Sequence, residues 1–307
     1  MPTTSQQKGI QFLDSLNNAK QKKDQRIIPI SEFNKQVYKL HSEGFEQATS
    51  TGFENLDYFY KIAKGMLTIV TGYASSGKSQ FLDQLMINLI TQNHNWKVLY
   101  ASFENRPIEL HIAKLLELIK QKPFFKGKNE RIHNEELKEQ LDFLNQKIAF
   151  IDYQKSRHIN DLIDVCKDFM DDDRFNYAYV IDPWNEITMP SFQNETHFVS
   201  ESLTKLKDFI DKTKVHLFLV AHPRKTREQD GTLPIPKLDM ISGSMNFWNK
   251  ADFGITVDLE DKASQQSLVN VYIQKARWRQ FGKKGKCKFT YNKITGQYQE
   301  YFEEINI

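Results

Sequence analysis

Residues 68–90 read TIVTGYASSGKSQFLDQLMINLI, an apolar segment followed by a glycine-bracketed turn and an amphipathic pattern. The turn, residues 72–79, fits G-x-x-x-x-G-K-[ST], in which backbone N–H groups cradle phosphates, the lysine reaches the β- and γ-phosphates, and the serine binds Mg²⁺. A strand before this motif and a helix after it are the context that it requires. The stretch therefore predicts a loop that holds a nucleoside triphosphate with Mg²⁺. The predicted nucleotide-binding residues are Gly72, Ser75, Ser76, Gly77, Lys78, Ser79 and Gln80.

The composition is that of an ordinary soluble globular protein, with 39% hydrophobic and 26% charged residues among 307. That length suits one large α/β domain with an arm, or two small domains. No apolar run approaches the roughly 20 residues that span a bilayer, and the N-terminus lacks the apolar core of a secretion signal. Cys166 and Cys287 lie far apart, which predicts neither a disulfide framework nor a zinc ribbon. We therefore expect a cytoplasmic protein with no membrane contact.

The first 50 residues are predicted to form an arm with a linker helix, and residues 51–307 the main domain. Residues 1 to about 28 are polar and rich in Gln, Lys and Asn, which is typical of a flexible arm. Residues 31–43 place Phe33, Val37 and Leu40 at helical spacing behind Ser31, a candidate N-cap. This pattern leaves open whether the helix packs on its own domain or on a neighbouring copy.

Strand and helix patterns alternate from residue 51 onward, which predicts an α/β fold with a mostly parallel sheet wrapped by helices. The strand candidates are residues 67–71, 98–103, 147–151, 177–182 and 216–221. The helical patterns are residues 78–93, 107–120, 134–146, 158–171 and 196–213. After residue 250 the segments FGITVDL, LVNVYIQKARW, CKFTYN and GQYQEYF predict further strands joined by short turns, ending in a hairpin around Thr295-Gly296.

Polar side chains end or directly follow three of these strands. Asp182 directly follows apolar Val180 and Ile181, which favours a second Mg²⁺ contact over a simple Asp-Pro turn. Glu104 follows the strand after the phosphate-loop unit, where it could act as a general base or merely cap a helix. His222 follows a third strand and could sense the γ-phosphate or have a structural role.

Two basic segments follow. The loop after His222 carries Arg224, Lys225, Arg227 and Lys237, which predicts either a single-stranded nucleic-acid contact or a solvated loop. Lys275, Arg277 and Arg279 recur at period two, so a strand would place them on one face. Such cations suit an arginine supplied to a neighbouring subunit's phosphate, or a general nucleic-acid patch.

The order of these motifs resembles one known family. TGFENLD, GYASSGKS, SFEN, YVIDPW, LVAHPRK, ISGSMNFWNKAD and KARWRQFGKKG follow one another along residues 51 to about 302. This series is similar to the C-terminal motor domain of DnaB-type hexameric replicative DNA helicases, especially the phage primase-helicases and their mitochondrial relative, Twinkle. The resemblance implies a RecA-like ATPase fold and an ATP-driven motor that translocates on single-stranded DNA as a homo-oligomeric ring.

The resemblance also implies roles for individual residues. Lys78 and Ser79 would hold phosphate and Mg²⁺, Glu104 would be the catalytic base, and Asp182 would orient Mg²⁺ and water. His222 would sense the γ-phosphate, while Lys275 and Arg277 would act on the neighbour's ATP. The implied DNA-binding residues are Arg224, Lys225, Arg227, Lys237, Ser242, Gly243 and Ser244. Tyr291 or Tyr298 near the last hairpin would stack on the nucleotide base.

The segment before the motor domain is shorter than in many members of this family. About 50 residues precede the motor, too few for a compact priming domain, so any primase is expected to be a separate protein. A phage-encoded protein would work in the host cytoplasm. Two other functions stay open at this point: a RecA-like recombinase or recombination mediator that forms filaments, and a regulatory or loading ATPase.

Overall fold

The computed structural model describes residues 27–46, 48–93, 95–152, 154–155, 157–191, 193–224, 233–241, 244–260 and 267–302. The chain divides into two compact units, with the boundary between Glu46 and Gln47. In the first unit, the 3₁₀ turn η1 (Ile30–Phe33) leads into α2 (Asn34–Glu43). The Ser31 cap is wrong, because the side chain of Ser31 caps neither element and only its carbonyl accepts a bond, from the N–H of Asn34. The apolar side chains of α2 are exposed.

The second unit is built on one sheet, whose order in the described part of the chain is β3-β2-β4-β5-β1-β6-β7-β8-β9. Its strands are β1 (Leu67–Thr71), β2 (Trp96–Ser102), β3 (Ile148–Phe150), β4 (Asn176–Asp182), β5 (His216–Val220), β6 (Phe253–Leu259), β7 (Ser267–Ala276), β8 (Gly285–Tyr291) and β9 (Tyr298–Tyr301). Neighbours from β3 to β6 pair in parallel, and β6 to β9 pair antiparallel. The predicted α/β fold, with a mostly parallel sheet and C-terminal antiparallel strands, is confirmed.

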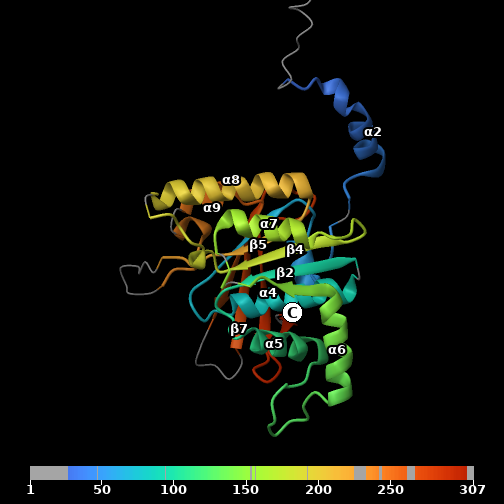
Figure 1. Cartoon of the computed structure of the whole chain (residues 1–307), viewed down its shortest axis with the longest axis vertical. Helices are drawn as coiled ribbons and strands as arrows, with labels where there is room; N and C mark the ends of the chain where they lie inside the picture. The colour runs from blue at the N-terminus through green and yellow to red at the C-terminus, as the bar shows by residue number, and fades with distance from the viewer. Residues whose placement is uncertain are drawn as a thin grey trace, which may run out of the picture. The chain divides into compact units, whose positions relative to one another are not determined.

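Helices cover both faces of the sheet (Figure 1). They are α3 (Glu54–Asp57), α4 (Lys78–Gln92), α5 (Ile108–Lys120), α6 (Asn134–Lys147), α7 (Ile159–Phe169), α8 (Glu195–Thr213) and α9 (Ser244–Lys250), with 3₁₀ turns η2 (Trp184–Glu186) and η3 (Leu238–Met240). The helices α4, α5 and α6 lie on one face, and α7, α8 and α9 on the other. Among the described residues, no helix combines the length and apolarity that crossing a membrane requires.

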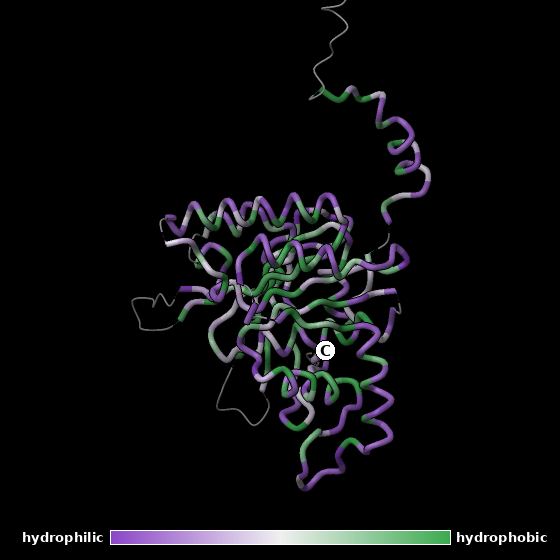
Figure 2. Tube along the Cα trace, viewed as in Figure 1, coloured by the Kyte–Doolittle hydropathy of each residue, from purple (hydrophilic) through white to green (hydrophobic). Residues whose placement is uncertain are grey.

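This layering explains the continuous apolar runs of the central strands in the sequence. All residues of β1 and β5 are buried, and Figure 2 shows apolar residues concentrated in the central strands. A parallel sheet covered on both faces requires such continuous apolar runs. Its carboxyl edge is where ligands bind in α/β folds, because the loops there diverge to opposite faces.

The prediction for residues 275–279 is wrong in one respect. The strand β7 ends at Ala276, so Arg277 and Arg279 do not continue its alternation. The chain turns because the N–H of Arg277 donates to the carbonyl of Asp252, 2.9 Å away, and Phe281 N–H then bonds back to Trp278.

Candidate functional site

The loop between β1 and α4 has the backbone that phosphate binding requires. Gly72 has φ +153°, and a Cβ there would lie 2.3 Å from the carbonyl oxygen of Val257. Gly77 has φ +89°, and its Cβ would lie 2.2 Å from the hydroxyl of Tyr298. Neither position can take a side chain without displacing its neighbour, so the two glycines of the motif are fixed by contacts as well as by curvature.

A cleft of about 580 Å³ opens over this loop. It is lined by Tyr73, Ala74, Ser75, Gly77, Lys78, Ser79, Gln80, Glu104, Lys114, His222 and Pro223. The lining residues come from the segments that follow β1, β2 and β5, from the first turn of α4 and from α5. The structure thus brings together most of the predicted nucleotide-binding residues with two of the predicted catalytic ones. Among the other predicted residues, Ser76 and Asp182 are buried.

Asp182 ends β4 and is only 4% exposed. Burial raises the pKa of this carboxyl group to about 6, and a hydrogen bond from the Ser79 hydroxyl opposes the shift. Its Oδ1 has no hydrogen-bond partner among the described residues. Hydroxyl and carboxylate oxygens are ligands that Mg²⁺ prefers, with phosphate oxygens supplying the rest of its coordination. Ser79 and Asp182 therefore fit the predicted metal position, although the described residues hold no cluster of three acidic, His or Cys ligands.

The cleft also contains a lysine, Lys78, a histidine, His222, and a general-base candidate, Glu104. The Nζ of Lys78 donates to the carbonyl of Tyr73 at 2.8 Å. Burial lowers the pKa of Lys78, and the charges of Asp182 and Glu104 act in the opposite direction. The Oε1 of Glu104 lies 3.5 Å from the Nε2 of His222. The pKa of His222 is lowered by burial first and then by the charge of Lys78.

The C-terminal hairpin contacts the phosphate loop through two hydrogen bonds. The hydroxyl of Tyr298 donates to the carbonyl of Gly77 at 3.0 Å, and the Nε2 of Gln80 donates to the carbonyl of Gly296 at 2.9 Å. Tyr298 is 3% exposed, so its ring is not available to stack on a base. Tyr291 packs against it with ring centroids 5.2 Å apart and does not line the cleft. Base stacking by Tyr291 stays a prediction.

The basic loop is anchored at both ends. The N–H of Arg224 donates to the carbonyl of Met240 at 2.8 Å, which closes the base of the loop. Its returning arm is held to the phosphate loop, because the hydroxyl of Tyr73 donates to the carbonyl of Pro234 at 3.0 Å. The carbonyl of Pro236 accepts bonds from side chains of β6 and β7. Lys237 is exposed. Predicted contacts outside the described residues are Lys225, Arg227, Ser242, Gly243 and the side chain of Ser244.

Lys275 and Arg277 lie at the opposite edge of the sheet from the cleft. The register pairs Phe253 of β6 with Thr68 at the start of β1 and with Ala276 at the end of β7. Four residue steps along β1, from Thr68 to Gly72, separate this edge from the phosphate loop by about 13 Å at the usual rise of a strand. The Nη1 of Arg277 lies 3.2 Å from the Oδ1 of Asp252. Burial, and then the charge of Arg277, lowers the pKa of Lys275 to about 8.

Comparison with known proteins gives this site its context. The family model described as "DnaB-like helicase C terminal domain" matches residues 48–300. The chain belongs to this family. The Twinkle homolog protein, chloroplastic/mitochondrial, of Arabidopsis thaliana is 35% identical over 279 residues. That match covers 86% of this chain, and the chain spans 38% of the length of that relative.

Solved structures confirm the predicted RecA-like ATPase fold of this DnaB-like domain. One solved ATPase domain superposes with a TM-score of 0.74 at 17% identity, over 89% of this chain and 99% of that one. A DnaB-like replicative helicase, determined with its interactions with primase, gives a TM-score of 0.71 at 17% identity. That match covers 90% of this chain and 69% of the other.

Several residues of this DnaB-like domain were missed by the sequence reasoning. Tyr73 and Lys114 line the cleft, and Asn185 accepts a bond from the N–H of His222 at 3.1 Å. Tyr298 was expected to stack on the base, but it instead supports the loop from 221 residues away in the chain. Tyr73 occupies a variable position of the phosphate-loop motif, and only the fold brings Lys114, Asn185 and Tyr298 to the site, so none of the four is marked in the sequence.

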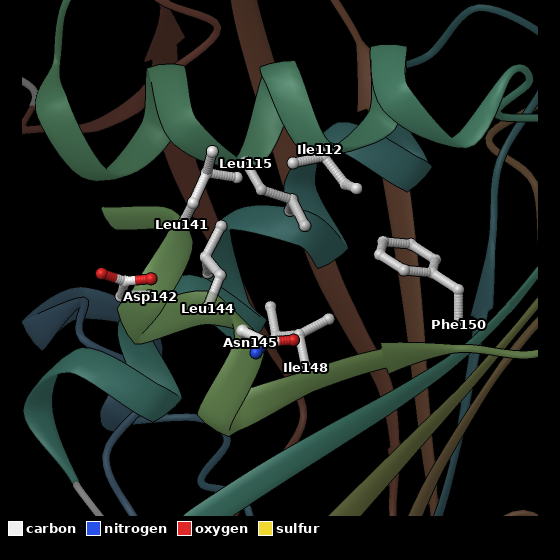
Figure 3. Close-up of a pocket in the computed structure, with 8 residues that line it drawn as sticks. All are labelled: Ile112, Leu115, Leu141, Asp142, Leu144, Asn145, Ile148 and Phe150. Carbon is white, nitrogen blue, oxygen red and sulfur yellow. The ribbon is translucent and has the colours of Figure 1, made fainter. Parts of the chain in front are cut away.

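A second hollow in the domain has different chemistry. It measures about 360 Å³ and lies between α5, α6 and β3 (Figure 3). Its lining is Ile112, Leu115, Leu141, Asp142, Leu144, Asn145, Ile148 and Phe150. No cation is among these residues, so this hollow does not suit a triphosphate.

Proposed function

We propose that this DnaB-like domain hydrolyses ATP, or another nucleoside triphosphate, with Mg²⁺ in a ring-forming homo-oligomer that translocates on single-stranded DNA and unwinds duplex DNA. One observation carries this proposal. The phosphate loop, Glu104 and Asp182 meet at the carboxyl edge of the sheet, whereas Arg277 lies at the other edge. A catalytic site that needs the phosphate loop and Arg277 together is complete only when the amino edge of the sheet in one copy meets the cleft of the next copy.

The residues of the cleft have separable tasks. The loop N–H groups and Lys78 bind the phosphates, and Glu104 accepts a proton from the attacking water. Bound Mg²⁺ would be held by Ser79 and Asp182 and would neutralise charge on the phosphate oxygens. His222 lies beside Glu104 and immediately precedes the basic loop, so its position can report the γ-phosphate to that loop.

The neighbouring copy would supply the remaining cations. Arg277, with Lys275 beside it, would stabilise charge that develops on the transferring phosphate, a role worth roughly 10³–10⁵ in rate. The exposed apolar side chains of α2 fit a helix that docks on an adjacent copy, and six copies would close the ring.

The DNA contacts would lie in the channel of that ring. Arg224, Lys237 and the predicted residues between them would neutralise the backbone of a single strand, with the segment from Ser242 to Ser244 beside them. A relative of this fold is described with its interactions with primase, and we propose that a separate primase is also a partner here.

Mixing two inactive variants tests the shared site. Lys78→Ala subunits cannot use their own loop but still offer Arg277, whereas Arg277→Ala subunits have an intact cleft. In an exchanged mixture about a quarter of the interfaces would pair an intact loop with an intact arginine, so a substantial part of the roughly 10³–10⁵-fold loss should return. A mixture as inactive as its components, in a sample shown to exchange subunits, would rule out the shared site.

An unwinding assay on a forked duplex with ATP and Mg²⁺ tests the rest of the proposal. Unwinding by closed rings is the expected result. Open filaments on DNA without unwinding would indicate a recombinase. An ATP hydrolysis rate that does not change when DNA is added would indicate a regulatory ATPase.

A further inference from the structure

Asp252 is a buried carboxylate that contacts Arg277. It follows α9, at the amino edge of the sheet. Its Oδ1 lies 3.2 Å from the Nη1 of Arg277. Its Oδ2 accepts bonds from the Nζ of Lys207 at 2.7 Å and from the N–H of Leu67 at 2.9 Å. Groups from α8, from the start of β1 and from the segment after β7 thus contact one carboxylate, and these contacts fix its position.

The end of α9 completes the support around the same arginine. The Nη2 of Arg277 donates to the carbonyl of Asn249 at 2.7 Å. The Nζ of Lys275 contacts the carbonyls of Trp248 and Asn249. Carbonyl groups at a helix C-terminus carry partial negative charge, which attracts both cations. The backbone adds a further restraint, because the N–H of Arg277 donates to the carbonyl of Asp252 at 2.9 Å.

The arrangement restrains Arg277 without neutralising it. Asp252 and Asp211 contribute two negative charges, and Lys207, Lys275 and Arg277 contribute three positive charges, so the group keeps a net positive charge. The side chain of Arg277 is 40% exposed, whereas that of Asp252 is 2% exposed. The guanidinium carries five N–H donors in a rigid fork. Donors that do not face Asp252 and Asn249 stay available for an anion from outside.

We propose that Asp252 is a positioning residue that orients Arg277 toward the ATP of the neighbouring subunit. The proposal rests on the trans role of Arg277 proposed above. It makes the catalytic arginine of one subunit part of a preformed support, so that little side-chain freedom is lost when the neighbour's phosphates arrive.

Alternatively, Asp252 would support the phosphate loop of its own subunit. Leu67 begins β1, the strand that ends at the phosphate loop, and its carbonyl accepts a bond from the N–H of Asp252 at 2.9 Å. Loss of the carboxylate could therefore disturb the loop of the same subunit. The two actions predict different outcomes in mixed rings, which makes them separable.

The experiment uses Asp252→Asn in the full chain. Turnover should fall about ten- to a hundredfold, as for a misplaced catalytic group, while ATP affinity measured with a non-hydrolysable analogue stays within about twofold. Mixing with Lys78→Ala should restore turnover, because those subunits supply an intact Asp252–Arg277 pair to the cleft of the variant. Asp211→Asn is the matched control, since Asp211 contacts Lys207 at 3.7 Å on the exposed side and should leave turnover unchanged.

Several results would overturn the inference. Unchanged turnover in Asp252→Asn would do so, and so would a mixture with Lys78→Ala that shows no rescue while the Arg277→Ala mixture is rescued. If the Arg277→Ala mixture itself is not rescued, the proposed function fails first. Circular dichroism and denaturation check the fold of Asp252→Asn. Asp252→Glu, which keeps the charge but displaces it by one methylene, provides a second variant with the same expected loss and rescue.

Discussion

Replacing Gly77 with alanine should damage the phosphate loop, and removing one distant oxygen should repair part of that damage. The Cβ of the introduced alanine would lie 2.2 Å from the hydroxyl of Tyr298 but 3.5 Å from the next atom of that side chain, Cζ. The first distance is a severe overlap, and the second is ordinary van der Waals contact. Tyr298→Phe should therefore relieve the overlap that Gly77→Ala creates.

The magnitude follows from three contributions. The left-handed backbone of Gly77, with φ +89°, costs about 1–2 kcal/mol once a Cβ is present. The overlap adds about 1–3 kcal/mol. Tyr298→Phe alone loses the bond to the carbonyl of Gly77, worth about 1 kcal/mol. In the double variant the overlap is absent, so the free energy of unfolding should exceed the additive value by about 1–3 kcal/mol.

Urea denaturation of the wild type, both single variants and the double variant measures this coupling. Binding of a fluorescent ATP analogue should follow the same order, with the double variant binding more tightly than Gly77→Ala. Gly296→Ala combined with Tyr298→Phe is the matched control. Gly296 also has positive φ, +70°, but its Cβ would meet the Nε2 of Gln80 at 2.5 Å, so this pair should be additive.

Two results would refute the reasoning. Strict additivity of Gly77→Ala and Tyr298→Phe would show that the hydroxyl does not limit the space beside Gly77. A double variant that binds ATP no better than Gly77→Ala would show that the hairpin does not set the shape of the loop.

Three further predictions concern chemistry, stability and DNA. Glu104→Gln should bind ATP normally but lose roughly 10²–10⁴ in turnover, because the amide cannot accept the proton; a loss below about tenfold would exclude it as the base. His216 is fully buried, and burial lowers its pKa to about 4, so the neutral ring is the folded form. Stability should therefore be complete above pH 6.5 and fall by about 3 kcal/mol as the pH drops to 4, a loss that should be absent in denaturation curves of His216→Gln. Lys225→Ala combined with Arg227→Ala should weaken single-stranded DNA binding and flatten its salt dependence with basal ATPase retained, and unchanged salt-dependent binding would place the DNA site elsewhere.

Much of the fold could be predicted because its central strands are buried on both faces. The limits of β1 and β4 follow from apolar runs, and Asp182 follows from its place at the end of such a run. What could not be predicted depends on contacts between distant segments. The position of Tyr298 beneath Gly77 requires the sheet order, and the end of β7 at Ala276 requires the bond from Arg277 to Asp252.

The bond from the Tyr73 hydroxyl to the Pro234 carbonyl has a mechanical consequence. The returning arm of the basic loop is held by the phosphate loop, and at Pro236 by side chains of β6 and β7. Because Pro234 and Pro236 are held at these points, this end of the basic loop is restrained relative to its own subunit. If the basic loop binds DNA, translocation along the single strand must come from displacement of entire subunits, and each subunit carries its own loop with it. The length of one step would then be set by the geometry between subunits and not by the reach of the loop.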